Sequence, residues 1–335
     1  MMKKILIITL IALISINIWA GRYAGDFMSI GSGVRPLGMG GAFSSIANDC
    51  SAIYWNASGI AQLRETEISL MRAFLYQGLA SYDNFSLAQP LPNNVTIGLN
   101  WTRLTVNDIP IYLEEHLKFN VDKRSAFPDF NLTGIPDGKF SSTDDLFQFA
   151  FAKHIHYDIN MGWLFFELPF DFYFGGNIKY IKRKIHQNIG TGTGFDFSFI
   201  TRTDLSVVFD IEWLGYVSFA MNFQDVGGTV ITWDLVSNHE DEVLFNNKMG
   251  ISLFQPLKFI NTMMILSKDT DYVYKTVHHY GLELLYEDFV GLRFGYYDDN
   301  LSTGLSFKVY GFTLNYAFVT NVLGNTNRVG LKINF

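Results

Sequence analysis

The side chains that could carry out chemistry are few and widely spaced. His154 and His156 stand two positions apart, so in a strand they would share one face, and His278 and His279 are adjacent later in the chain. A metal site at these histidines is the minor alternative, because no cysteine or carboxylate pattern accompanies them. The sequence contains no Gly-x-Ser-x-Gly turn and no recognisable serine, histidine and acid set. We therefore expect no catalytic, metal or cofactor site, and a protein that is not an enzyme.

The chain is predicted to consist mainly of strands, because its last third alternates apolar and polar residues. The final segment has an apolar and a polar face, with Val329, Leu331, Ile333 and Phe335 on one and Arg328, Gly330, Lys332 and Asn334 on the other. Segments 301–309 and 311–319 alternate in the same way. Soluble helices and buried parallel strands do not show this pattern. It predicts an all-β fold, a transmembrane antiparallel β-barrel, in which the last residue belongs to a strand.

The amino terminus predicts export. Lys3 and Lys4 precede an apolar run from Ile5 to Trp19, and small residues follow at 20 and 21. This run of about 15 residues is shorter than the roughly 20 that a membrane-spanning helix needs. It therefore indicates a signal peptide over residues 1–20, with cleavage after Ala24 and a retained anchor as alternatives. Together with the barrel pattern, it predicts a protein of the outer membrane.

Charge and composition narrow the class of partner. Removing Lys3 and Lys4 lowers the basic residues from 25 to 23, against 32 acidic ones. Nucleic acid is not expected as a partner, because binding it requires a concentrated basic surface. The single cysteine, Cys50, cannot form an internal disulfide. The 16% aromatic content and the 29 glycines are typical of a membrane barrel with aromatic girdles, so outer-membrane lipid is an expected contact.

A barrel of about 14 strands is expected over residues 66–335. Sixteen segments are candidates, and those at 159–167 and 203–210 are the weakest; the others are 66–75, 80–89, 94–104, 145–154, 171–185, 191–201, 213–223, 246–255, 258–268, 278–287, 289–297, 301–309, 311–319 and 327–335.

Two connections, 105–144 and 224–245, are long, and long loops of such barrels are extracellular. The second holds Asp225, Gly227 and Trp233, which form a candidate partner loop, because exposed tryptophan is enriched in binding sites. Anchoring at the membrane interface is the alternative for Trp233.

Residues 21–65 do not alternate, so they are expected to form an amino-terminal hatch or plug inside or below the barrel. Irregular backbone exposed to lipid would leave amide groups unsatisfied. The segment is rich in glycine between Gly31 and Phe43, and short polar side chains follow it. We expect the hatch to depend on Arg35, Gly38, Gly40, Gly41, Asp49, Asn56 and Gly59.

At these residues the chain resembles a known family. The run RPLGMGGAFSSIANDCSAIYWNASGIAQL is similar to the amino-terminal signature of PorV/PorQ proteins, relatives of the FadL-type fatty-acid transporters, and the resemblance continues to the final NRVGLKINF. It implies a 14-stranded outer-membrane barrel with a hatch, and it makes Phe335 similar to the terminal signal of barrel assembly. The family usually has Asn-Pro-Ala where this chain has Asn56-Ala57-Ser58, so the fixed backbone angle of proline is missing.

The resemblance leaves two functions open. PorV-like proteins belong to the type IX secretion machinery and bind cargo or translocon proteins, whereas FadL-like proteins pass long-chain fatty acids or other hydrophobic molecules through a kink in the barrel wall. A transporter of this second kind needs an apolar lumen, yet the positions assigned inward include Asn94, Thr96, Gly98 and Asn100. The sequence therefore favours binding of protein partners, with uptake of a hydrophobic small molecule as the alternative.

Overall fold

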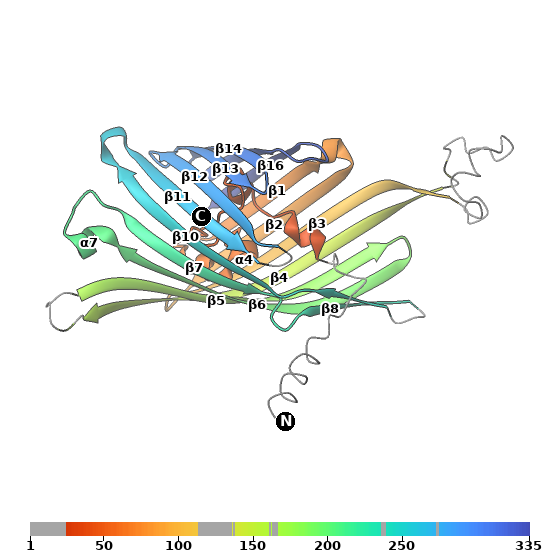
Figure 1. The fold of residues 1–335 in the computed structure, drawn as a ribbon, viewed down its shortest axis with the longest axis horizontal. Helices are drawn as coiled ribbons and strands as arrows, with labels where there is room; N and C mark the ends of the chain where they lie inside the picture. The colour runs from red at the N-terminus through yellow and green to blue at the C-terminus, as the bar shows by residue number, and fades with distance from the viewer. Residues whose placement is uncertain are drawn as a thin grey trace, which may run out of the picture.

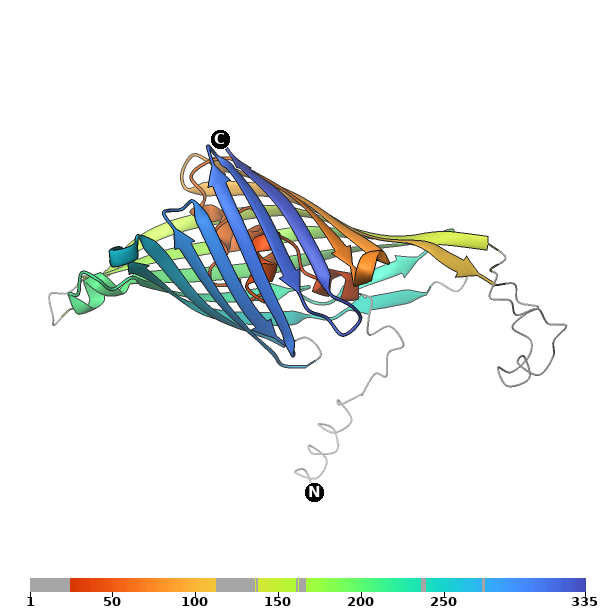
Figure 2. The same cartoon turned by 90° about the horizontal axis from the view of Figure 1, so that it is seen from above.

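The computed structural model describes residues 25–112, 136, 138–160, 162, 167–235, 239–272 and 275–335. Its main element is a closed antiparallel barrel (Figures 1 and 2). Neighbouring strands pair in chain order, β1 pairs with β16, and β5 with β6, so the described wall closes without a free edge. In the described part of the chain the barrel has fourteen strands, namely β1 (Glu67–Leu75), β2 (Ala80–Leu91), β3 (Val95–Ile111), β4 (Gly138–Asn160), β5 (Glu167–Ile185), β6 (Asn188–Asp204), β7 (Tyr216–Gln224), β10 (Asn246–Leu257), β11 (Thr262–Asp271), β12 (Val277–Tyr286), β13 (Val290–Tyr297), β14 (Asn300–Val309), β15 (Phe312–Val319) and β16 (Thr326–Asn334).

The alternation in the sequence separates the two faces of the wall. In β4, Phe147, Phe149 and Phe151 are exposed on the outside, while Gln148 and Ala150 between them are buried inside. The inward positions named from the sequence are confirmed for Thr96, Gly98 and Asn100, whereas Asn94 lies in the turn before β3. The described residues contain no helix that is long and apolar enough to cross a membrane.

Two predicted strands are wrong. Residues 159–167 fall on the end of β4 and the start of β5, with 161 and 163–166 outside the described residues. Residues 203–210 fall on the end of β6 and on a short helix, α7 (Leu205–Phe209). The side chain of Asp204 accepts a hydrogen bond from the Ser206 N–H at 2.8 Å, and Asp210 adopts a left-handed conformation. Both features are helix-terminus signals, and they end the strand here.

The two ends of the barrel differ. The turn end carries Phe335, the start of β1 and the short turns 92–94, 258–261, 287–289 and 310–311. The loop end carries both long connections. β3 and β4 remain paired up to Ile111 and Gly138, so they project from the loop end as a ribbon (Figures 1 and 2). The rest of this connection, residues 113–135 and 137, lies outside the described residues.

The second long connection also contains strands that were not predicted. β8 (Thr229–Trp233) and β9 (Glu240–Val243) form a hairpin, and β8 pairs with β6 at Gly190–Gly192. The hairpin therefore extends the wall at the loop end. These strands have five and four residues, too few for the alternation to be recognised in sequence.

Residues 25–63 form short helices inside the barrel (Figure 1). We call residues 25–63 the internal segment; its helices are α2 (Asp26–Ser29), α3 (Val34–Gly38), α4 (Ala52–Trp55) and the 3-10 helix η1 (Ala57–Gln62). Met39, Phe43, Ile46, Ile53 and Ile60 are fully buried. Most of the buried apolar core lies between this segment and the inner face of the wall, so the barrel interior is filled.

Candidate functional site: the internal segment and the turn-end cavity

Inward polar side chains of the wall bind the backbone of the internal segment. The carboxylate of Asp269 on β11 accepts hydrogen bonds from Phe43 N at 3.0 Å and Ser44 N at 2.6 Å. Further along the wall, Asn177 Nδ2 on β5 donates to Ile53 O at 2.7 Å, and Asn222 Nδ2 on β7 donates to Trp55 O at 2.6 Å. Short helices leave many backbone groups without partners, so these side chains supply what helical hydrogen bonding does not.

A buried ionic cluster fixes one side of the segment. Glu283 of β12 accepts from Arg35 Nη2 at 2.7 Å and from Arg293 Nε of β13 at 2.6 Å. Arg35 Nη1 also bonds Asn48 Oδ1 at 2.6 Å and Asp49 Oδ2 at 3.2 Å. We call Arg35, Asp49, Glu283 and Arg293 the inner cluster; it joins the segment to the wall.

The charges of this cluster shift the pKa values of its members in the internal segment. Burial lowers the pKa of Arg35, but the carboxylates of Glu283 and Asp49 outweigh burial and raise it above its usual value. Burial raises the pKa of Asp49, but Arg35 and then Lys332 outweigh it, so this pKa lies below 3.8. Both groups are therefore held in their charged forms.

Asp49 and Asn56 hold the internal segment together. Asp49 Oδ1 accepts from Ser51 N at 3.0 Å and from the Ser51 hydroxyl. Asn56 Oδ1 accepts from Ser58 N at 3.2 Å, while its Nδ2 donates to Ser44 O at 3.0 Å. Asn56 is thereby the cap of η1, so a side-chain hydrogen bond stabilises the turn in which the resembling family has proline.

The predicted glycines lie where backbones approach closely. A Cβ on Gly38 would come within 3.2 Å of Gly304 Cα on β14, and one on Gly40 within 2.8 Å of Tyr296 N on β13. Gly40 and Gly41 also have φ values of 65° and 76°, which favour glycine. A Cβ on Gly59 would overlap the carbonyl of Ala47 within the segment itself. The glycine-rich motif therefore lets the segment lie directly on the wall.

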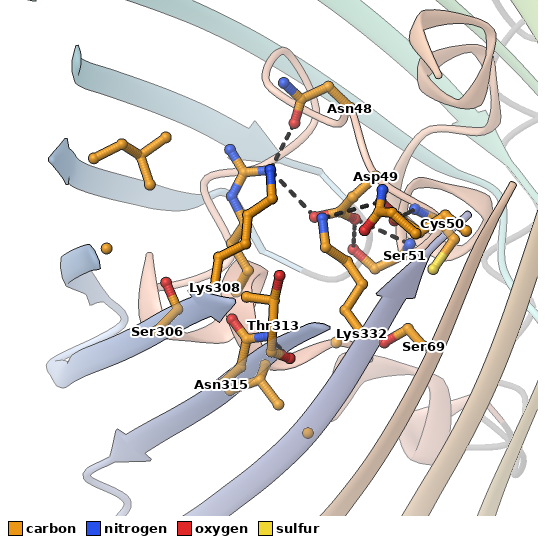
Figure 3. Close-up of a pocket in the computed structure, with 18 of the residues that line it drawn as sticks. Asn48, Asp49, Cys50, Ser51, Ser69, Ser306, Lys308, Thr313, Asn315 and Lys332 are labelled. Atoms are coloured by element: carbon orange, nitrogen blue, oxygen red, sulfur yellow. Dashed lines mark hydrogen bonds and ion pairs between the residues drawn. The ribbon is translucent and has the colours of Figure 1, made fainter. Parts of the chain in front are cut away.

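A polar cavity of about 320 Å³ lies between the internal segment and the turn-end parts of β1 and β12–β16 (Figure 3). The segment contributes Arg35, Asp49 and Ser51, and Gln62, Arg64 and Glu65 lie along its lining. The wall contributes Glu67, Ser69, Arg293, Ser306, Lys308, Thr313, Asn315, Lys332 and Asn334. This lining suits a polar or charged molecule, because an apolar one would strip water from charged groups without replacing their hydrogen bonds.

The expectation that Trp233 is exposed is wrong. Its side chain is 7% exposed, and its indole N–H donates to Asp241 at 2.8 Å within the β8–β9 hairpin. Asp225 is also buried and pairs with Lys179 at 2.8 Å, while Gly227 is exposed. Asp225 and Trp233 are covered because the hairpin folds against the wall and the start of the internal segment. The role of this loop in partner binding stays a prediction.

The histidines and the cysteine have structural contacts. His154 Nε2 and His156 Nδ1 both bond Asp171 Oδ1, at 2.7 and 3.0 Å, and His279 Nδ1 bonds Gly40 O at 2.7 Å. Across the described residues, no group of three metal-binding side chains is found. Cys50 is buried, and burial and the Glu67 carboxylate raise its thiol pKa.

Phe335 lies at the turn end, where it exchanges backbone hydrogen bonds of 3.1 Å with Thr66. Its side chain is exposed. A role in barrel assembly stays a prediction.

Sequence reasoning missed the charged residues of the wall that hold the segment, above all Glu283 and Asp269. Glu283 stands between Leu282 and Leu284, so its place in an alternating strand marked it as inward. Its partner Arg35 could not be found this way, because Arg35 lies 248 residues away in sequence.

No family model matches the chain, and no curated protein matches its sequence. Among solved structures, the P. putida toluene transporter TodX is similar, with 9% identity, a TM-score of 0.50, and coverage of 91% of this chain and 99% of that one. The Acinetobacter baumannii outer membrane protein Omp33 has 9% identity, a TM-score of 0.39, and coverage of 81% and 98%. From the likeness to TodX and the strand pairing, the chain has the fold of a 14-stranded β-barrel of the outer-membrane type.

Proposed function

We propose that this chain is an outer-membrane protein that binds protein partners at its loop end and is not an enzyme. The internal segment would then be a fixed hatch. The resemblance to PorV/PorQ proteins supports a place in type IX-like secretion or surface attachment. The observation that carries the proposal is the combination of a filled interior with an uninterrupted wall.

The wall pairing favours binding over passage. A FadL-like channel needs a kink in the wall through which its hydrophobic cargo leaves. In the described strands the register shifts at one place, between Val106 and Ile109, and this place lies on the projecting ribbon. The pairs β1–β2, β2–β3, β4–β5 and β5–β6 run without a shift. This continuity supports a closed barrel.

The ribbon of β3 and β4 is the surface that we propose for the partner. Beyond Val106 and Ser142, its two strands pair with each other at Ile109–Ile111 and Gly138–Phe140, past the last residues of β2 and β5 that pair with them. Exposed β-ribbons can bind partners through edge pairing and side chains. The ribbon contains the two ends of the long connection 105–144 that the structure describes.

Removing the ribbon tests the proposal. Val106 and Ser142 are direct partners, so replacing residues 107–141 by Asn-Gly would close them with a two-residue hairpin turn. The pair between Asp144 and Arg183, at 2.9 Å, would remain. We expect this variant to fold and to lose the proteins that co-purify with the wild type in native mass spectrometry. As a control, Lys139→Gln removes one exposed ion pair of the ribbon and should leave capture nearly unchanged.

The second candidate is a FadL-like channel for hydrophobic molecules, and the likeness to TodX, a toluene transporter, favours it. Under this proposal the hatch would move during transport. Vesicles containing the purified protein would then take up toluene or a long-chain fatty acid faster than empty vesicles. Uptake by both the wild type and the ribbon deletion, with no protein captured by either, would replace the first proposal by the second.

A further inference from the structure

We propose that the turn-end cavity is a binding site for the carboxylate or phosphate group of a polar ligand that enters from the turn end. The proposal rests on a row of donors on the cavity wall. It does not depend on which partner or cargo the loop end recognises.

Four neighbouring strands place donors side by side on the inner face. Lys308 of β14 is paired with Thr313 of β15, Thr313 with Lys332 of β16, and Lys332 with Ser69 of β1. All four line the cavity, and Figure 3 labels them. Directly paired residues point to the same face, and the two lysines are two strands apart, roughly 10 Å. Their flexible side chains can therefore reach one anion above Thr313.

Thr313 supplies the second observation. It is 7% exposed, and its hydroxyl has no hydrogen-bond partner among the described residues. The amide oxygen of Asn334, which also lines the cavity, is likewise unpaired. Thr313 is paired with a lysine on each side, and buried polar groups are usually bonded, so its unpaired hydroxyl indicates an acceptor that comes from outside the chain.

The two buried carboxylates of the cavity, Asp49 and Glu67, already accept hydrogen bonds, so a cation is not the preferred ligand. Glu67 accepts from Cys50 N at 2.6 Å, Asn334 Nδ2 at 3.0 Å and Lys332 Nζ at 3.0 Å. Glu67 would keep two donors if Lys332 turned toward a ligand. Lys308 pairs with Asp288, whose side chain is 73% exposed, and an exposed pair of this kind contributes little to stability. Lys308 can therefore exchange this partner for a ligand at little cost.

The volume of the cavity points to a ligand larger than a free anion. Its 320 Å³ lies at the lower end of small-molecule sites, which are about 300–1,000 Å³. The oxyanion is thus one group of a polar molecule, such as the terminus of a short peptide or a phosphorylated sugar.

The test is titration calorimetry on the purified full-length protein in detergent. The probes are inorganic phosphate, acetyl-Ala-Ala with a free carboxylate, and the same dipeptide as its amide. We expect phosphate or the free dipeptide to bind and the amide to bind at least five-fold more weakly. The probe that binds more tightly distinguishes a phosphate site from a carboxylate site. Absence of heat with all three probes, or equal binding of acid and amide, would overturn the proposal.

Substitutions of Lys308 and Thr313 test whether the row of donors binds the anionic probe. Lys308→Gln and Thr313→Val should each weaken binding at least three-fold, and Thr313→Ser should bind as the wild type does. Lys153 is the control, because it is also a turn-end lysine but bonds only the carbonyl of Asn93 among described residues, away from the cavity. If Lys308→Gln and Thr313→Val fold, as judged by heat-modifiable gel mobility, and bind like Lys153→Gln, the site is not where we place it.

Discussion

The barrel holds two sets of ion pairs that use the same chemistry in opposite surroundings. In the inner cluster, the side chains of Glu283 and Arg293 are 0% and 3% exposed. On the outer face, Arg72 and Asp83 pair at 2.9 Å with exposures of 56% and 30%. Removing one partner of a buried pair leaves a charge without water, whereas an exposed partner is rehydrated. The inner cluster should therefore contribute far more to stability than the exposed pair of Arg72 and Asp83.

The outer pairs belong to a row that crosses five strands. Cross-strand partners alternate in charge in the order Arg72, Asp83, Arg103, Asp145 and Lys182. The neighbouring outward row toward the turn end is apolar or aromatic, with Leu70, Phe85, Trp101, Phe147 and Tyr180. Charges on a lipid-facing wall cost roughly 2–4 kcal/mol at the membrane midplane and far less at its edge. The row thus marks the limit of the apolar surface on this side of the barrel.

The largest effect is expected for Glu283→Ala. Arg35 and Arg293 would lose their shared carboxylate, and Asp49 alone would remain beside them. Breaking a buried pair costs about 3–5 kcal/mol. Urea unfolding in lipid vesicles, followed by tryptophan fluorescence, measures this loss. A loss below about 1 kcal/mol would mean that the inner and outer pairs are equivalent.

The next effect is expected for Gly295→Ala on β13. Its new Cβ would overlap the backbone nitrogen of Gly40, so the internal segment would have to move from the wall. Overpacking of this kind costs about 1–3 kcal/mol. We expect higher conductance in planar bilayers and faster proteolysis of residues 25–63. Gly138→Ala is the control, because the nearest contact of its new Cβ would be an ordinary 3.7 Å. Equal conductance and proteolysis of the two variants would contradict a direct contact between the internal segment and the wall at Gly295.

A smaller effect is expected at acid pH. The pKa of Asp49 lies below its ordinary value of 3.8 in the folded protein, because Arg35 and Lys332 outweigh burial. Its ionisation therefore stabilises the fold above about pH 4, and this contribution is lost as the pH falls through the lower folded pKa. Asp49→Asn should flatten the acid limb of unfolding free energy against pH. Asp108→Asn, at an exposed ribbon pair, should keep the wild-type slope.

The smallest effect is expected for Asp83→Asn in the outer row. Arg72 is more than half exposed, so losing its partner should change the unfolding free energy by no more than about 1 kcal/mol. The same vesicle unfolding experiment applies. A loss as large as that of Glu283→Ala would show that lipid, and not water, surrounds the row.

The sequence by itself determined the barrel, because a strand exposes alternate residues to opposite surroundings. Alternation in 301–309, 311–319 and 327–335 located β14–β16 to within a residue, and the absence of alternation before residue 66 set the internal segment apart. The glycines of that segment were recognisable because glycine adopts conformations that other residues avoid.

Tertiary structure decided which side chains meet. The partners of Arg35, the pairing of Lys332 with Ser69, and the contact of Arg183 with Trp233 all join residues far apart in sequence. Alternation tells which face a residue occupies, but strand register and the path of the internal segment bring it to its neighbour. The short β8–β9 hairpin was missed for the same reason, because its structure depends on contacts with the wall rather than on a local pattern. The end of β6, in contrast, is set by the local helix-terminus residues Asp204 and Asp210.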